Sequence, residues 1–369
     1  MIVENLFKSI DKGRSGLNSG LSSGFKKLDK LVFGVQRQWM TVWAGDSGSG
    51  KSSLVLFSQI YQPFQQYYHD KNIDVHFLIY SFEMSSEVLL AKLLSLYLYD
   101  TYNRILSYGD ILSLGNTLSD EDFDLIKSAT PWLKEFESRC EIIDKPVNAK
   151  ALYAITKSFT EKFGVYEEDE KSFEGYKKEI YYPNNPKQYL ITVIDHIKLL
   201  SVSPGHTSKQ EIDEACDYLI YFRNKCFLNV NIVQQLNRNF KSMDRRNSDN
   251  SLIGLEDLSD SSGPAQAAES VIAIYHPYRE KRTKCEGYDI RQLKHLARLI
   301  QILKNRFGEA DKCFGVCFYG QNGLWKELPM PDQINDYSIY QNLKEREKKL
   351  KRLIKEFQNL LKFYMEFLL

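Results

Sequence analysis

Short apolar runs alternate with segments of helical periodicity along most of the chain. The runs that predict strands are 39–44, 75–81, 140–143, 189–194, 230–234, 271–275, 299–303 and 314–319. Helical patterns follow the first four runs, at 52–61, 85–98, 149–163 and 209–225. Strands that alternate with helices predict an α/β fold, with a mainly parallel sheet flanked by helices on both faces. The final two strands, joined by the turn-like segment NRFGEADK, predict an antiparallel appendage.

Other segments depart from the alternation and suggest three regions. Residues 1–23 combine a short helical pattern at Val3–Ile10 with a linker rich in Gly and Ser. Residues 24–332 are expected to form the main domain. Within that domain, 166–187 is dense in charge and tyrosine, and 238–252 is polar and basic. Both read as surface insertions.

The third region, 333–369, has the pattern of one long helix. Leu343, Leu350, Phe357 and Tyr364 recur every seven residues, and Ile354 is one of several apolar residues that widen the stripe. This spacing predicts a helix that packs on its own domain or on a partner. A coiled coil is the sharper alternative.

Composition excludes several classes of protein. The chain has 369 residues, 43% hydrophobic residues and a net charge of +1, which is ordinary for a globular protein. No apolar run approaches the ~20 residues that span a bilayer, and no secretory signal opens the chain, so a cytoplasmic protein without membrane contact is expected. Six scattered cysteines include no CxxC pair. Cys313 and Cys317 would share one face of a strand, which favours packing over metal binding.

The clearest chemical signal is the segment Gly45–Ser52, which matches GxxxxGK[ST] between a predicted strand and a predicted helix. Glycines let backbone N–H groups wrap phosphates, and the helix N-terminus adds partial positive charge. Lys51 would neutralise the β- and γ-phosphates, and the Ser52 hydroxyl would ligate Mg²⁺. The predicted ATP-binding residues are Gly45, Asp46, Ser47, Gly48, Ser49, Gly50, Lys51, Ser52 and Ser53.

An acid that holds Mg²⁺ should end an apolar strand, so that it projects from the carboxyl edge of the sheet. Asp195, which closes LITVID, fits this requirement, and Asp144 after CEIID is the rival. A base for the attacking water is expected after the strand next to the phosphate-binding strand. Glu83, just after LIYSF, is the candidate. Its alternative role is a charge that favours a helix N-terminus.

Five sequence blocks in order resemble the motor domain of the DnaB family of replicative helicases, which has a RecA-like fold. The blocks are SSGFKKLDKLVFGVQRQWMTVWAGDSGSGKSS, YSFEMSSE, VIDHIKLLS, QQLNR and LKNRFG. They cover about residues 21–325. The N-terminal domain with which bacterial DnaB contacts primase has no counterpart in this sequence.

The resemblance implies roles for five residues. It makes Glu83 the catalytic base and Asp195 the acid linked to magnesium. It makes Gln235 the sensor of the γ-phosphate, and Lys304 and Arg306 a cationic pair that reaches the nucleotide of a neighbouring subunit. The alternative for this pair is a solvated strand end.

The resemblance also has a gap in the expected DNA contacts. The family often carries an arginine in the segment aligned with DLSDSSG, where this chain has Ser259 or Asp260. The adjacent basic loop could compensate, because phosphate contacts need only positive charge. The predicted DNA-binding residues are Arg238, Lys241, Arg245, Arg246 and Gly263. A second basic stretch, 279–294, is a weaker candidate, and both could instead be solvated loops.

The function that these features favour is an ATP-dependent helicase motor that translocates on single-stranded DNA as a homo-oligomeric ring, expected to be a hexamer. A primase or a helicase loader is the expected partner. Two alternatives stay open. One is a RecA-like recombination or switch ATPase, and the other is a loading or assembly factor that acts through its C-terminal helix.

Overall fold

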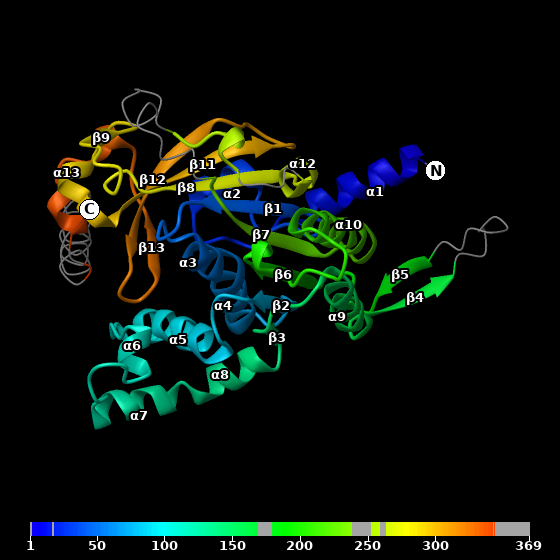
Figure 1. Ribbon diagram of the computed structural model, residues 1–369, viewed down its shortest axis with the longest axis horizontal. Helices are drawn as coiled ribbons and strands as arrows, with labels where there is room; N and C mark the ends of the chain where they lie inside the picture. The colour runs from blue at the N-terminus through cyan, green and yellow to red at the C-terminus, as the bar shows by residue number, and fades with distance from the viewer. Residues whose placement is uncertain are drawn as a thin grey trace, which may run out of the picture.

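The computed structural model describes residues 2–16, 18–168, 179–237, 252–258, 263–341 and 343. Its centre is a nine-stranded sheet in the order β13-β12-β11-β8-β1-β7-β6-β2-β3 (Figure 1). These strands are β1 (Met40–Gly45), β2 (Val75–Ser81), β3 (Cys140–Ile143), β6 (Tyr189–Asp195), β7 (Asn229–Gln235), β8 (Ser270–Tyr275), β11 (Ala297–Asn305), β12 (Lys312–Tyr319) and β13 (Leu324–Glu327).

The predicted fold class is confirmed by how these strands pair. Strands β8, β1, β7, β6, β2 and β3 are parallel to one another. Strand β11 runs antiparallel to β8, and β12 and β13 continue the antiparallel part. The carboxyl ends of the parallel strands therefore meet at one edge, where loops can build a site.

Helices cover both faces of the sheet (Figure 1). The longer of these are α3 (Lys51–Val55), which continues through a π-helical turn (Leu56–Tyr61) into α4 (Gln62–His69), α5 (Ser86–Tyr102), α7 (Asp120–Ser128), α8 (Thr130–Glu137), α9 (Ala149–Glu161) and α10 (Ser208–Cys226). Helix α1 (Ile2–Arg14) precedes them in the chain. Shorter ones are α2 (Lys26–Val32), α6 (Tyr108–Ile111), α12 (Gly263–Ala267) and α13 (Ile290–Leu293).

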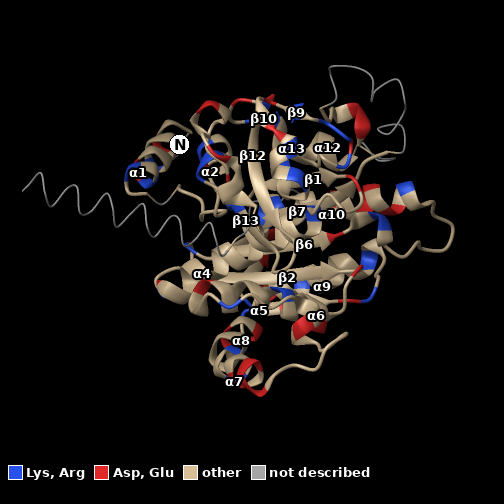
Figure 2. Cartoon of the chain, turned by 90° about the vertical axis from the view of Figure 1, so that its left-hand side faces the viewer, with Lys and Arg blue, Asp and Glu red and all other residues tan. Residues whose placement is uncertain are grey.

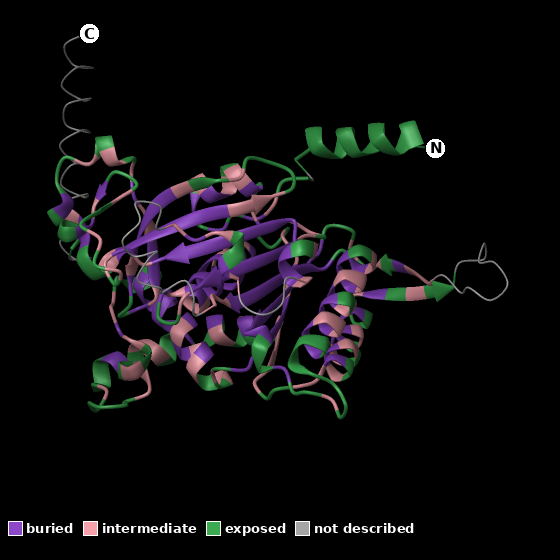
Figure 3. Ribbon diagram, turned by 45° about the horizontal axis from the view of Figure 1, so that its top comes forward, coloured by how far each residue is buried: buried purple, intermediate pink, exposed green. Residues whose placement is uncertain are grey.

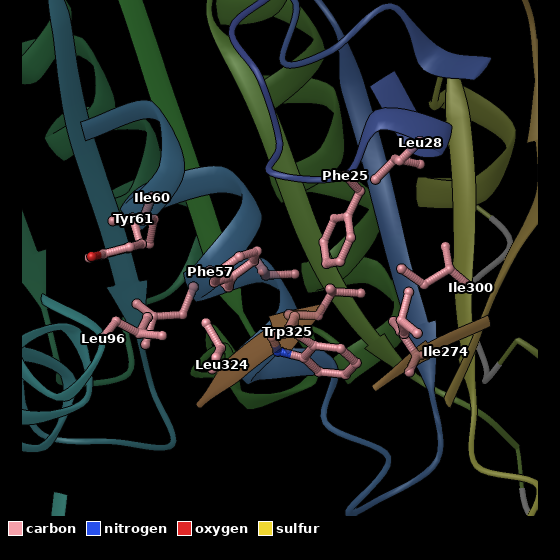
Figure 4. Packing of buried hydrophobic residues seen from close by; sticks show 14 of the residues in the cluster. Phe25, Leu28, Phe57, Ile60, Tyr61, Leu96, Ile274, Ile300, Leu324 and Trp325 are labelled. Atoms are coloured by element: carbon pink, nitrogen blue, oxygen red, sulfur yellow. The ribbon is translucent and has the colours of Figure 1, made fainter. Parts of the chain in front are cut away.

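Two apolar cores form because successive side chains of a strand point to opposite faces. In β1, Trp43 belongs to one core and Val42 to the other. The core on the Trp43 side includes residues of α3, α4, α5, β11, β12 and β13. The core on the Val42 side includes residues of α9, α10 and α12. Figure 4 shows part of the first core, where Trp325 of β13 lies near Phe57 of the π-helical turn. Both rings are almost completely buried.

Several elements differ from the sequence-based expectation. The helix after the phosphate loop continues beyond its predicted end at Tyr61 to His69, and Pro63 lies within it just after the π-helical turn. Helices α6, α7 and α8 and strand β13 were not predicted. The insertion at 166–187 contributes to an antiparallel hairpin of β4 (Gly164–Glu168) and β5 (Glu179–Pro183).

The two ends of the chain differ in packing. Helix α1 buries no residue and stands away from the body of the molecule (Figure 3). Toward the other end, Tyr337–Tyr340 form a 3₁₀ turn whose terminal tyrosines are buried, and Leu343 is buried as well. The long helix predicted for the C-terminal region falls mostly on 344–369, which lie outside the described residues.

Among the described helices, none has the length and apolar character that a bilayer crossing requires. All six cysteines are free.

Candidate active site

The phosphate-binding loop connects β1 to α3 at the carboxyl edge of the sheet. Gly48 and Gly50 have φ angles of 73° and 101°, a region that residues with a side chain rarely adopt. Ser49 N–H closes the loop on Asp46 C=O at 3.1 Å. Alternating backbone conformations of this kind turn N–H groups inward, and helix α3 begins directly behind them. The loop is therefore built to receive phosphate groups.

Lys51, Ser52 and Asp195 come together at the start of α3. Lys51 is buried, and burial lowers its pKa against the opposing effect of Asp195, Glu83 and Asp46. Asp195 is 5% exposed and hydrogen-bonds the side chain of Ser52. Its Oδ1 is buried and has no partner among the described residues. Such an oxygen beside a serine hydroxyl fits a Mg²⁺ ion, which prefers oxygen ligands.

Glu83 lies in the turn between β2 and α5. The turn is fixed because Ser81 Oγ donates to Met84 C=O at 2.7 Å and Phe82 N–H donates to Asp195 C=O at 2.8 Å. Ser81 and Asp195 are paired at the ends of β2 and β6, so the two acids lie on the same edge. The Glu83 side chain is 38% exposed, which leaves it open to water.

One expectation about Glu83 was wrong. Strand β2 is not next to the phosphate-binding strand, since β7 and β6 separate it from β1. Glu83 nevertheless acts electrostatically on Lys51. The neighbour of β1 on that side is β7, whose last residue, Gln235, is paired with Gly45. Gln235 is thus brought beside the first residue of the loop.

Lys304 and Arg306 lie at the opposite edge of the sheet. Lys304 Nζ donates to Ala265 C=O at 2.9 Å and to Gln266 C=O at 2.8 Å. Arg306 N–H donates to Glu269 C=O, and its guanidinium pairs with the Glu269 carboxylate at 3.1 Å. Glu269 in turn accepts from Met40 N–H, the first residue of β1.

This placement puts Arg306 far from the phosphate loop of its own chain. The contact at Met40 marks the amino end of β1, and the loop begins at the other end, Gly45. Six strand residues span about 20 Å. An arginine side chain is too short to cross this distance, so the structure does not bring Arg306 to its own nucleotide site.

The remaining candidates have simpler outcomes. Asp144, the rival acid, accepts from Ser86 N–H and Ser86 Oγ and so supports the start of α5. Gly263 begins α12 and is half-buried. The predicted DNA-binding residues Arg238, Lys241, Arg245 and Arg246 lie outside the described residues. In the basic stretch 279–294, Arg279 pairs with Asp46 of the phosphate loop at 4.0 Å.

Sequence reasoning missed four residues around the site. The first is His196, whose Nε2 lies 3.4 Å from Glu83 Oε1. The second is Lys92 on α5, whose pKa is lowered by burial, while the charges of Asp195 and Glu83 oppose that shift. Arg279 and Arg298 contact the phosphate loop from outside. One signal was available, because Arg298 is a charged residue inside the apolar strand ARLIQIL.

Burial of Asp195 has a measurable cost in the ligand-free protein. Desolvation raises its pKa from 3.8 to about 6. Between these values the folded chain holds more protons at this group than the unfolded chain, so stability falls as pH rises from about 4 to about 6. Asp195→Asn should therefore raise the free energy of unfolding at pH 7 by roughly 1–3 kcal/mol.

Denaturant unfolding at pH 7 and pH 4 checks this result. The stabilisation should become small at pH 4, where the carboxyl is protonated in the folded state and close to half protonated in the unfolded state. A variant that is less stable than wild type at pH 7 would contradict the assignment of Asp195 as a buried, costly carboxylate.

Comparison with known proteins agrees with this geometry. Among curated proteins, none matches the chain significantly. A solved structure described as a DnaB-like replicative helicase and its interactions with primase superposes with a TM-score of 0.62 at 18% identity, covering 88% of this chain and 66% of that one. A second solved structure, described as an ATPase domain, gives 0.61 at 18% identity, covering 89% of this chain and 99% of that one. Both similarities are structural and support the RecA-like fold.

The family model described as the DnaB-like helicase C-terminal domain matches residues 20–323. The matched segment includes the phosphate loop, both acids at the carboxyl edge and the pair at the end of β11. The chain therefore belongs to the DnaB-like helicase C-terminal domain family.

Proposed function

We propose that this protein is an ATP-dependent DNA helicase motor that translocates on single-stranded DNA as a ring of identical subunits, six in number. The observation that carries the proposal is the separation of Arg306 from the phosphate loop of its own chain, about 20 Å by the length of β1. A site that needs this cation is complete only where two copies meet.

The chemistry of ATP hydrolysis is assigned to groups at the carboxyl edge. Loop N–H groups and Lys51 hold the phosphates, and Glu83 takes a proton from the attacking water. Gln235 reports whether a γ-phosphate is present, because it is paired with the first loop residue. Ser52 and Asp195 would hold Mg²⁺, which neutralises charge on the phosphates when it is bound.

Arg306 completes the site of the adjacent subunit. A cation supplied in trans stabilises charge in the transition state and makes hydrolysis depend on assembly. Lys304 would accompany it, since the two cations lie close enough for the charge of Arg306 to add to burial in lowering the pKa of Lys304. In the isolated chain its hydrogen bonds to the end of α12 hold it in place.

Helix α1 supports self-association. Ile2, Val3, Leu6, Phe7 and Ile10 are all exposed, and their spacing puts them along one side of the helix. A groove of about 720 Å³ lies just beyond this helix, lined by its linker, by residues in and after α2 and by Phe307 beyond the end of β11. Phe33, Trp39 and Phe307 are among the groove residues, so a second copy offers an apolar surface that α1 can cover.

The proposal is tested by assays that separate it from its alternatives. Purified protein should hydrolyse ATP faster with single-stranded DNA and should displace a strand from a forked duplex. Electron microscopy with an ATP analogue and an oligonucleotide should reveal closed rings. ATP hydrolysis without strand displacement would favour a recombination or switch ATPase. Removal of 336–369 separates the motor from a loading factor that acts through its C-terminal helix, because an intact motor after this deletion would point back to the helicase.

DNA binding should weaken steeply with salt. Figure 2 shows Lys and Arg positions interspersed with Asp and Glu positions along the described chain, so we assign the phosphate contacts to the basic loop 238–252. Replacing Arg245 and Arg246 together by glutamine should lower the slope of log affinity against log salt by roughly 1.4, because two single-strand phosphate contacts are lost. Fluorescence anisotropy measures the slope. A slope equal to that of wild type would remove this loop from the DNA path.

A further inference from the structure

Two arginines donate hydrogen bonds to backbone C=O groups on the outer side of the phosphate loop. Arg298 of β11 donates from Nε to Ser49 C=O at 2.6 Å. Arg279, in the segment after β8, donates from Nη1 to Ser47 C=O and lies near the Asp46 carboxylate. Both come from the side of β1 on which β8 and then the antiparallel strand β11 lie. Neither belongs to the loop motif.

These contacts determine where the loop N–H groups point. The C=O of Ser47 and the N–H of Gly48 share one rigid peptide plane and point in opposite directions, and the same holds for Ser49 and Gly50. When an arginine holds each C=O outward, the two glycine N–H groups face the phosphate side. The glycines are also the residues whose positive φ gives the loop its shape, and they are the least restrained by their own sterics.

Arg298 is buried in an unusual way for a charged side chain. It is 5% exposed, and Nη1 donates to His295 C=O at 2.7 Å and to Ala297 C=O at 2.8 Å. The guanidinium also lies over the Phe318 ring, 5.4 Å from the ring centre. No carboxylate of the described residues forms an ion pair with it. Burial lowers its pKa to about 9. A buried charge without an oppositely charged partner is costly, and a bound polyphosphate on the other side of the loop would offset that cost.

Arg279 contributes from a different environment. Its side chain is 48% exposed, and its guanidinium fills the space beside Gly48, where a Cβ would lie only 2.7 Å from Nη1. Burial lowers the pKa of half-buried His276, and the charges of Arg298 and Arg279 lower it further. The positive charge is therefore concentrated on one side of the loop.

We propose that Arg279 and Arg298 are positioning residues that hold the phosphate loop open for a triphosphate by fixing two of its peptide planes. The proposal rests on the proposed function only in taking a nucleoside triphosphate as the ligand. It assigns the arginines no contact with the reacting atoms.

The first test uses Arg279→Gln, because its partial exposure makes loss of folding unexpected. Lys281→Gln is the matched control, since it removes one exposed positive charge two residues away. Equilibrium binding of ATP and of inorganic tripolyphosphate, both with Mg²⁺, is measured for each variant. Arg279→Gln should weaken both ligands by roughly tenfold, the range expected for a lost hydrogen bond from a charged group, and the control should leave both unchanged.

The second test uses Arg298→Lys and Arg298→Gln, with thermal unfolding measured alongside. Lysine keeps the charge but lacks the planar fork that spans the three carbonyls, so it should bind ATP more weakly than wild type and more tightly than Arg298→Gln. In steady state, KM should rise with Kd while kcat stays within about twofold, as for a group that binds ground and transition states alike.

Two results would overturn the inference. One is an ATP affinity of Arg279→Gln equal to that of the control, and the other is a fall in kcat with KM unchanged. The readout is binding, so it is separable from the proposed function. A wild-type protein that binds ATP without unwinding DNA would defeat the helicase proposal and leave this inference standing.

Discussion

Glu83→Gln should reduce ATP turnover by roughly 10²–10⁴-fold and leave ATP affinity nearly unchanged. An amide has the size of the carboxylate but cannot accept a proton from water. The fold should be retained, because the turn that presents residue 83 is held by Ser81 and Phe82 rather than by the Glu83 side chain. The amide oxygen also keeps an acceptor for His196 Nε2, which lies 3.4 Å from Oε1.

Steady-state turnover and equilibrium ATP binding measure the two halves of this result. Glu87→Gln is the matched control, because it removes an acid from the first turn of α5 without facing Lys51. If Glu83→Gln lost ATP affinity while each bound nucleotide turned over normally, Glu83 would serve structure, and the base would lie elsewhere.

The fold was predictable from sequence wherever one local pattern decided the element. Strands β2 and β3 begin and end where the apolar runs predicted. The phosphate loop was predictable because its glycines, its lysine and its two flanking elements all indicate the same structure. Asp195 followed from the rule that a strand end at the carboxyl edge faces the ligand.

The order of the strands in the sheet could not be predicted from the local sequence pattern. The apolar runs do not state that β7 and β6 insert between β1 and β2, so Glu83 was expected closer to the loop strand than it lies. Helices α6 to α8 were also not predicted, because they bury only part of their surface against the first core. The starts of α6 and α7 are fixed by the side-chain caps Ser107 and Ser119, which are weak signals in sequence.

The contacts of the two arginines show why parts of the site cannot be read from sequence. Arg298 is 249 residues from Ser49 and Arg279 is 232 residues from Ser47. Only the pairing of β8 with β1 and of β11 with β8 brings them to the phosphate loop. A charged residue inside an apolar strand indicates that it has a polar partner, but the sequence does not show which residue that partner is.

Arg306→Ala should lower ATP turnover by ~10³-fold or more, as for other arginines supplied in trans. ATP binding and ring formation should persist. Stability should change little, because Glu269 keeps its ion pair with Arg223 at 2.9 Å and its bond from Met40 N–H at 2.7 Å, so no buried carboxylate is left unpaired. Lys312→Ala serves as the control, since it removes an exposed cation from the next strand.

Mixed assemblies distinguish a cation in trans from one in cis. An Arg306→Ala subunit has an intact phosphate loop, and a Lys51→Ala subunit has an intact Arg306, so each variant alone should be inactive. Where the nucleotide of the first subunit meets the arginine of the second, the interface is complete and ATP turnover should return. About 20 Å separates Arg306 from its own loop, so a subunit cannot supply both groups to one nucleotide. Rings shown to be mixed that stay inactive at every ratio would count against a site shared between subunits, and with it against the ring motor.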